Sequence, residues 1–187
     1  MKAEKLAIPE VILLEPPRFS DARGFFSETY VYARFAAAGI EARFIQDNHS
    51  LSVERGTIRG LHCQLAPNPQ GKLVRCVRGA IWDVAVDIRA GSPSYGRHVS
   101  AVLSAENWRQ LWIPEGFLHG FCTLEPMTEV IYKVTAPYDR AAERGVVWND
   151  PDLALPWPVR PEEAVLSDKD RVLPHVTEAA GWFGYPR

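Results

Sequence analysis

Short stretches of alternating apolar and polar residues dominate this sequence. In the clearest, residues 80–89, Trp82, Val84, Val86 and Ile88 alternate with Asp83, Ala85, Asp87 and Arg89. A period of two predicts a strand with one buried face. Similar short runs occur at residues 44–45, 73–77, 99–103, 110–113, 121–124 and 129–135, separated by turn-rich pieces such as AGSPSYG and APNPQG. Many short strands at such spacing predict an all-β sandwich or barrel.

Helix is a minor component of the predicted structure. One helix is expected at about residues 28–38, with Ser27 as its N-terminal cap and Gly39 ending it, and a short turn could follow Ser104. After Trp148 the proline-rich run NDPDLALPWPVRPEE lacks periodicity, so it should wrap over the sheets as an irregular tail.

Length and composition favour one enzyme-sized unit. The 187 residues are 47% hydrophobic, with no repeat or linker, which predicts a single domain over residues 1–187. A formal net charge of -2 supplies no basic field for a nucleic acid. With no signal-peptide core and no run long enough to span a membrane, we expect a cytoplasmic protein. Cys63, Cys76 and Cys122 form no CxxC pair, which favours small apolar core residues over a disulfide framework.

Polar and ionisable residues gather in a few short segments. They are Arg23, then Gln46, Asp47 and Asn48, then Arg59, His62 and Lys72, then His119, then Tyr132 and Lys133. In the predicted strand 129–135, Val130, Tyr132 and Val134 share one face, so Tyr132 should point into the apolar interior. Taken alone, a buried tyrosine usually bonds a backbone carbonyl, and a lone His62 could be a core histidine.

The segments match one family in order and spacing. The chain resembles dTDP-4-dehydrorhamnose 3,5-epimerases in DARGFFSETY, IQDNHSLS, IRGLHCQ, QGKLVRCVRGAIWDVAVDIR, SPSYG, LSAENWRQLWIPEGFLHGF, EVIYKVT, ERGVVWNDP and LSDKD, which together extend from Asp21 to Asp170. The resemblance implies a cupin-type jelly-roll barrel of two antiparallel sheets with a few short helices, in agreement with the strand spacing.

The resemblance also implies a catalytic set. The family inverts C3 and C5, both alpha to the C4 ketone of dTDP-4-dehydro-6-deoxyglucose, in dTDP-L-rhamnose biosynthesis. His62 aligns with its general base and Asp170 with the carboxylate that orients the base. Lys72 aligns with the cation beside the C4 oxygen, where it would stabilise an enolate. Tyr132 aligns with the acid on the opposite face of the sugar. A helix-capping role for Ser167 and Asp170 is compatible with these assignments.

Further positions align with substrate contacts of the family. Arg23 and Arg59 resemble the residues that hold the diphosphate, for which guanidinium groups are well suited. Others align with contacts to nucleotide or sugar: Glu28, Gln46, Asp47, Asn48, His119, Glu143 and Lys169, with Tyr138 as the ring that stacks on thymine. Two positions depart from the pattern, Cys63 where tyrosine is expected and Asp139 where a second aromatic would be unsurprising, and both bear on the shape of the pocket.

Several alternatives remain open at this point. PEGFLHGF resembles half of a cupin metal motif, but His62 is followed by Cys63 and Gln64, so the H-x-H half is missing and no metal or other cofactor is expected. A closer alternative is an epimerase that inverts one centre of a related dTDP-4-ketohexose, and another is a sugar-nucleotide-binding cupin without turnover. The resemblance implies a homodimer that exchanges an N-terminal strand, which would carry Arg23 and Glu28 to the partner's site.

Overall fold

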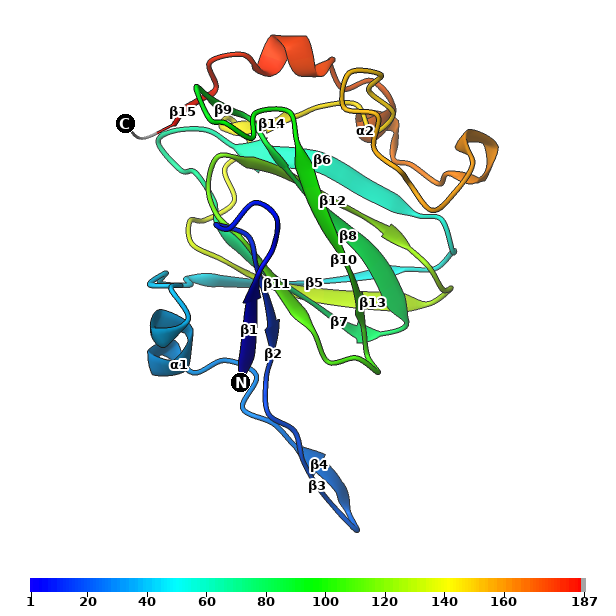
Figure 1. Ribbon diagram of the computed structural model, residues 1–187. Coiled ribbons are helices and arrows are strands. Elements are labelled where there is room, and N and C mark those ends of the chain that lie inside the picture. The colour runs from blue at the N-terminus through cyan, green and yellow to red at the C-terminus, as the bar shows by residue number, and fades with distance from the viewer. Residues whose placement is uncertain (186–187) are drawn as a thin grey trace.

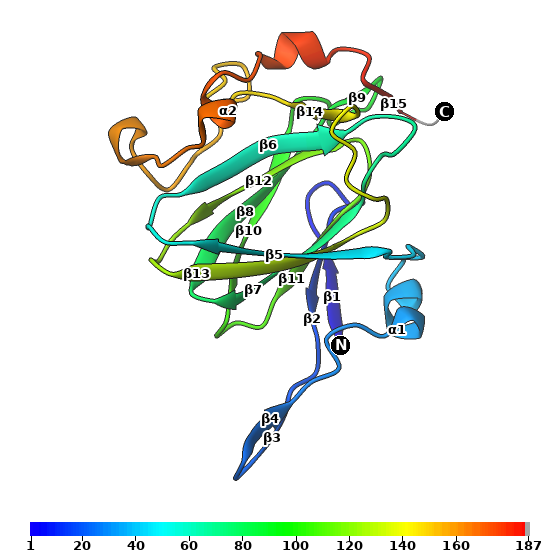
Figure 2. The same cartoon turned by 180° about the vertical axis from the view of Figure 1, so that it is seen from behind.

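Two antiparallel sheets face each other across the interior of the protein. The computed structural model describes residues 1–185. One sheet has the strand order β1-β2-β11-β7-β13-β5, with β1 (Lys2–Lys5), β2 (Ile12–Glu15), β11 (Gln110–Ile113), β7 (Lys72–Arg78), β13 (Thr128–Val134) and β5 (Gln46–Ser52). The other has the order β10-β8-β12-β6-β14, with β10 (His98–Ser104), β8 (Ala80–Asp87), β12 (Phe117–Thr123), β6 (Ile58–Gln64) and β14 (Glu143–Gly145). The all-β jelly-roll prediction is confirmed, and Figures 1 and 2 show the two layers from opposite sides.

The remaining elements are short and lie outside these sheets. They are the hairpin β3 (Phe19–Asp21) and β4 (Gly24–Phe26), the parallel pair β9 (Arg89–Ala90) and β15 (Phe183–Gly184), the helices α1 (Tyr32–Ala37) and α2 (Asp168–Arg171), and the 3-10 turns η1 (Pro161–Glu163) and η2 (Val176–Ala179). No helix of the described chain is long and apolar enough to cross a membrane.

The main core lies between the inner faces of the two sheets. Its members include Val74, Leu111 and Val130 from one sheet and Ile81 and Phe121 from the other. Their burial removes a large apolar area from water, which is the main driving force for closing the two sheets together. Outside this apolar core, a polar opening is left between the two sheets, and it is the candidate site.

The prediction that residues 80–89 form a strand with one buried face is wrong in one respect. In β8 both faces are buried, because Val84 and Val86 pack under the C-terminal segment while Ile81 and Ala85 face the interior of the barrel. Asp83 shares the interior face and is completely buried. An irregular tail was predicted after Trp148, and this segment covers the outer face of β8. Its larger side chains in this packing include Leu153, Trp157 and Trp182.

The predicted helix starts later than expected. Helix α1 begins at Tyr32 with Val31 at its N-terminal cap, so the stretch from Glu28 is not helical. The Ser27 hydroxyl accepts a hydrogen bond from Trp108 Nε1 (3.1 Å), and the Thr29 carbonyl accepts one from Gln110 Nε2 (2.9 Å), which holds this stretch beside β11. The predicted end is confirmed, since Gly39 follows the helix with φ +90°.

Two strands lie outside the predicted segments, and the partly buried face of one of them, β5, is polar. Strand β5 covers Gln46–Ser52, beyond the predicted residues 44–45, and β6 (Ile58–Gln64) was not among the predicted runs. Along β5 the partly or fully buried positions are Gln46, Asn48, Ser50 and Ser52. A search for alternating apolar residues misses such a strand, because its buried face serves a cavity and not the core.

The hairpin β3–β4 projects from the rest of the molecule (Figures 1 and 2). Phe19, Phe25 and Phe26 are each more than half exposed, although Phe25 contacts the Trp108 ring edge-on at 4.7 Å between centroids. A two-stranded hairpin is marginally stable in isolation, and clustered exposed aromatics are typical of a contact surface.

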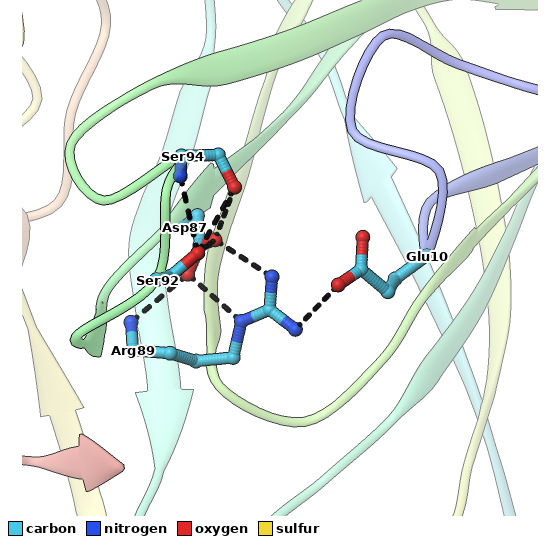
Figure 3. Close-up of polar contacts among 5 residues, drawn as sticks. All are labelled: Glu10, Asp87, Arg89, Ser92 and Ser94. Carbon is cyan, nitrogen blue, oxygen red and sulfur yellow. Dashed lines mark hydrogen bonds and ion pairs between the residues drawn. The ribbon is translucent and has the colours of Figure 1, made fainter. Parts of the chain in front are cut away.

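A buried ionic network joins the N-terminal turn to the barrel. Arg89 donates to both carboxylate oxygens of Asp87 (2.9 and 2.7 Å) and to Glu10 (2.9 Å), while Ser92 and Ser94 donate to Asp87 (2.6 Å each) (Figure 3). Every charge in this network has a hydrogen-bonded partner, which is the condition for burying charge at tolerable cost. The network anchors β9 and the residues before β2.

Candidate active site

A cavity of about 460 Å³ opens between the two sheets. All four residues that the sequence marked as catalytic lie in its wall, which includes Ser50, Arg59, His62, Lys72, His119, Phe121, Tyr132, Ser167, Lys169 and Asp170. The volume is in the range of small-molecule sites. His62 and His119 come from the five-stranded sheet, whereas Lys72 and Tyr132 come from the six-stranded sheet.

His62 and Asp170 form a closely bonded pair. His62 Nε2 lies 2.7 Å from Asp170 Oδ1, although 108 residues separate the two in sequence. Burial acts to raise the pKa of Asp170, but the hydrogen bond and charge of His62 outweigh it, so this pKa falls below its usual range. An ionised carboxylate can only accept, so Nε2 donates to Asp170 and Nδ1 is the ring nitrogen left for the substrate. The pair therefore has the form of an oriented general base.

The close approach of two strands fixes the backbone beside His62. Gly60 has φ +126°, and a Cβ at this position would lie 2.7 Å from Gly120 Cα of β12. Only glycine permits this contact, which brings β6 against β12 so that His62 and His119 become paired neighbours in the sheet.

A short helix brings Asp170 to the cavity. The Ser167 hydroxyl caps α2 by accepting from the Asp170 backbone N–H (3.1 Å), as the capping pattern in LSDKD predicted. In the same helix, Lys169 Nζ donates to Glu143 Oε1 (2.6 Å), and the Tyr138 hydroxyl donates to Glu143 Oε2 (3.1 Å). The three predicted contacts Tyr138, Glu143 and Lys169 thus form one chain beside the cavity, with the Tyr138 ring largely exposed.

Lys72 and Tyr132 stand on neighbouring strands of the opposite sheet. Burial lowers the pKa of Lys72, whose Nζ donates to the His62 carbonyl at 3.4 Å. Burial raises the pKa of Tyr132, so its phenol keeps its proton through the neutral range. The prediction that Tyr132 points inward is confirmed, because it packs against the main core and lines the cavity.

Two other predicted contacts lie along β5 and β6. Arg59 lines the cavity and donates to Ser52 Oγ (3.2 Å) and to the Leu51 carbonyl (3.1 Å). Gln46 donates to Asn48 Oδ1 (2.8 Å), and its Oε1 accepts from the Tyr138 backbone N–H (3.1 Å). These bonds tie the segment that carries Tyr138 to the edge of β5.

Of the ten predicted substrate contacts, Arg59, His119 and Lys169 line the cavity, and the other seven do not. Gln46, Asn48, Tyr138 and Glu143 are bonded beside it, whereas Asp47, Arg23 and Glu28 form ion pairs elsewhere. Asp47 lies between two inward-facing residues of β5 and forms an ion pair with Lys133 (2.8 Å). Arg23 lies on the projecting hairpin, paired with Asp21 (2.6 Å), and Glu28 pairs with Arg34 (2.8 Å). Arg23 and Glu28 belong to the segment expected to reach a partner's site.

The structure adds residues that the sequence analysis did not single out. Ser50 lines the cavity, and its buried Oγ has no hydrogen-bond partner among the described residues, a state that calls for an explanation such as a bound polar group. The signal for it was present, since Ser50 follows Gln46 and Asn48 at the period of a strand. Asp83 lies against His119, with its two carboxylate oxygens 3.1 and 3.0 Å from Nε2. It was overlooked because its face of β8 was taken as the polar outer face.

The two departures from the family pattern lie outside the cavity wall. Cys63 packs in the apolar cluster beneath the C-terminal segment, where burial raises its pKa to about 12. Asp139 accepts from Asn68 Nδ2 (2.9 Å) and from the Ala141 backbone N–H (2.9 Å), so it shapes the turn after Tyr138. Neither side chain is among the residues that line the cavity. In the part of the chain described, no group of three or more His, Cys, Asp or Glu residues is placed to hold a metal ion.

Comparison with known proteins gives consistent matches over nearly the whole chain. The family model for dTDP-4-dehydrorhamnose 3,5-epimerase matches residues 5–178. A relative from Sinorhizobium fredii, named dTDP-4-dehydrorhamnose 3,5-epimerase, is 50% identical over 99% of this chain and 94% of its own length.

Two solved structures are similar throughout. A Bacillus anthracis dTDP-4-dehydrorhamnose 3,5-epimerase with TDP and pyrophosphate bound has a TM-score of 0.90 and 49% identity, covering 93% of this chain and 98% of that one. A Legionella pneumophila dTDP-6-deoxy-D-glucose-3,5-epimerase in complex with dTDP-4-keto-L-rhamnose has a TM-score of 0.92 and 41% identity, covering 100% and 99%. With the cavity and its paired His62 and Asp170 in the same fold, this chain belongs to the dTDP-4-dehydrorhamnose 3,5-epimerase family.

Proposed function

We propose that this protein converts dTDP-4-dehydro-6-deoxyglucose to dTDP-4-dehydro-L-rhamnose by inverting C3 and C5. The observation that carries the proposal is the placement of a carboxylate-bonded His62 on one sheet and a protonated Tyr132 on the other, with Lys72 in the same cavity. The ligand named in the Legionella pneumophila complex, dTDP-4-keto-L-rhamnose, is the product expected of this reaction.

The first half of the reaction is proton removal. Nδ1 of His62 takes the proton from the carbon alpha to the C4 ketone, and the electron pair of the broken C–H bond moves to the C4 oxygen. Lys72 stabilises the resulting enolate with a fixed positive charge in a partly buried site. Asp170 stabilises the imidazolium that forms on His62.

The second half is protonation from the other side of the ring. The Tyr132 phenol gives its proton to the same carbon as the electron pair returns from the enolate oxygen, so the configuration of that carbon is inverted. His62 then releases its proton to solvent, and Tyr132 takes up a proton from solvent. One base and one acid serve C3 and C5 in turn, because both carbons flank the same ketone.

The substrate's nucleotide and diphosphate need contacts beyond the reacting sugar. Arg59 and the free hydroxyl of Ser50 suit phosphate oxygens, and the exposed Tyr138 ring suits stacking on thymine. Arg23 is the second guanidinium expected to bind the diphosphate. We propose a homodimer in which the hairpin β3–β4 and the residues after it carry Arg23 and Glu28 to the partner's cavity. The exposed phenylalanines of the hairpin support this.

Turnover of dTDP-4-dehydro-6-deoxyglucose, followed by proton NMR at C3 and C5, tests the function. The proposal predicts inversion at both carbons. Inversion at C3 alone would identify a single-centre epimerase, and tight dTDP binding with no exchange at either carbon would identify a binding protein without turnover.

A further inference from the structure

A second histidine–carboxylate pair lies inside the barrel, apart from His62 and Asp170. Asp83 stands in the middle of β8, completely buried, with Ile81 and Ala85 as the neighbours on its face. Its two oxygens lie 3.1 and 3.0 Å from Nε2 of His119, and no other hydrogen bond to its side chain is present among the described residues. A buried carboxylate is costly unless it is paired, which means that this pair needs an explanation.

The pair fixes the protonation state of His119. The carboxylate accepts and cannot donate, so Nε2 of His119 carries its hydrogen toward Asp83. Burial lowers the pKa of His119, with Asp83 opposing this and Lys72 and His62 adding to it. The ring is then neutral, and Nδ1 is left as an acceptor in a side chain that lines the cavity.

The same carboxylate acts on Lys72. No carboxylate lies within 4.0 Å of Lys72 Nζ among the described residues, so the ammonium has no direct ion pair. The charged and titratable groups around it come from four strands: His62 and Cys63 of β6, Asp83 of β8, His119 of β12 and Glu143 of β14. Burial lowers the pKa of Lys72, and Cys63, Asp83 and Glu143 raise it. Of these three groups Asp83 is the completely buried carboxylate, so water screens it least.

We propose that Asp83 is a positioning residue of the epimerase site, which holds His119 as a neutral hydrogen-bond acceptor and keeps Lys72 positively charged for enolate stabilisation. This rests on the proposed function. The Asp83 side chain is not part of the cavity wall, and it acts through His119 and Lys72, which are.

The variant Asp83→Asn tests the proposal because it keeps the volume and removes the charge. We expect kcat to fall on the order of tenfold to a hundredfold, as for loss of a group that orients and charges the reacting site, while dTDP binding changes less than about twofold. The pKa of Lys72 should fall further, so the alkaline limb of the kcat profile should move to lower pH. A lower kcat with an unmoved limb would assign Asp83 a packing role and overturn the proposal, as would an unchanged kcat.

Asp150→Asn is the matched control. Asp150 is also buried, at 1% exposure, and bonds a histidine, His175 Nδ1 at 3.0 Å, but neither residue lines the cavity. This variant should lower the midpoint of thermal unfolding and leave the pH profile in place. If it shifted the limb as Asp83→Asn does, the shift would report general loosening and the proposal would fail.

A measurement on the wild-type protein covers the case in which Asp83→Asn does not fold. Nitrogen-15 NMR of the histidine rings, with His119 assigned by His119→Gln, should show a neutral Nε2–H tautomer at pH 7. A charged ring or an Nδ1–H tautomer would overturn the proposal. Absence of turnover in the wild type would instead overturn the proposed function and leave this result standing.

Discussion

The base assignment depends on two side chains that only the fold brings together. His62 and Asp170 are 108 residues apart in sequence, yet His62 Nε2 lies 2.7 Å from Asp170 Oδ1. Each has a common structural explanation when considered alone, a core histidine and a helix-capping residue. Their direct bond, in the wall of one cavity, favours the catalytic assignment over two independent structural roles.

Removal of His62 should abolish hydrogen exchange at both carbons. In His62→Ala we expect deuterium uptake at C3 and C5 of the substrate to fall by about a thousandfold or more, because general base catalysis of both steps is lost. His175→Ala, which removes a histidine bonded to a carboxylate outside the cavity, should exchange at the wild-type rate. Exchange that persists at either carbon in His62→Ala would assign a different base to that carbon.

Loss of the Asp170 charge should have a smaller effect. Asp170→Asn leaves the imidazole in place but removes stabilisation of the imidazolium and of the correct tautomer. We expect kcat for both exchanges to decrease by roughly a hundredfold, less than in His62→Ala. Equal losses in the two variants, measured by the same exchange experiment, would mean that Asp170 takes the proton itself or that the site has collapsed.

At the residue scale, the four expected catalytic residues His62, Lys72, Tyr132 and Asp170 do line one cavity, but the direction of side chains was predicted less evenly. Period two placed Tyr132 inward correctly, because its strand has a plainly apolar inner face. The same rule failed for Asp83, since β8 is covered on both sides and its charged residue faces the interior. A single sequence carries no signal for which residues from the distant tail cover a strand.

Among the elements, the shortest helix has the greatest consequence for the site. Helix α2 has four residues and is capped by Ser167, and it is joined to β14 by the bond between Lys169 and Glu143. A helix of this length is not stable without such tertiary contacts. Its position therefore determines how well Asp170 meets His62.

The cap can be tested separately from the chemistry. Ser167→Ala should lower the free energy of unfolding by about 1 kcal/mol, the usual value of an N-terminal cap. It should also reduce kcat, by less than Asp170→Asn, because α2 holds Asp170 less firmly. Urea unfolding and the exchange assay measure the two effects, and Ser92→Ala, which removes a hydroxyl that is not in the cavity wall, serves as a control for the second. A full loss of activity in a folded Ser167→Ala protein would mean that the hydroxyl itself contacts substrate.

The boundaries of helices and strands were hardest to predict where side chains contact something other than the apolar core. The start of α1 was placed too early because Ser27 looked like a cap, whereas its hydroxyl binds Trp108. All of β5 was missed since its partly buried face is polar, and β6 was missed because His62 and Gln64 interrupt its apolar positions. In each case a tertiary contact decides the local structure, and tertiary contacts are absent from a local pattern.

On the scale of the whole molecule, the hairpin β3–β4 is the part of the fold that a single chain leaves unexplained. It carries Arg23 and three exposed phenylalanines away from the barrel. If it reaches a partner's cavity, each site needs two chains. A mixed dimer can then combine defects that lie in different subunits.

Two inactive variants should restore activity when they share a dimer. Arg23→Ala and His62→Ala, co-expressed with different tags and purified through both, would give a mixed dimer with one intact site, and about half of the wild-type activity is expected for a two-fold dimer. Dimers of each variant alone are the controls. No recovery in the mixed species, or a monomer by light scattering with full activity, would show that Arg23 acts within its own chain or not at all.

In the proposed mechanism, the two sheets supply the two faces of the reaction. His62 lies on the five-stranded sheet and Tyr132 on the six-stranded sheet, with the cavity between them. Protons should therefore leave one face of the sugar and arrive on the other, which is the requirement for inversion. This division of roles between base and acid is the central claim of the proposed mechanism.

Turnover by Tyr132→Phe in heavy water, followed by proton NMR at C5, tests that claim most directly. The ring still packs in the strand, and Tyr30→Phe, on the outer face of the same sheet, is the matched control and should behave as the wild type. We predict that C5 of the Tyr132→Phe reaction takes up deuterium with retained configuration while inverted product falls by at least about a hundredfold, the usual loss on removing a general acid. Inversion of C5 at the wild-type rate in this variant would contradict the mechanism and make Tyr132 a structural residue.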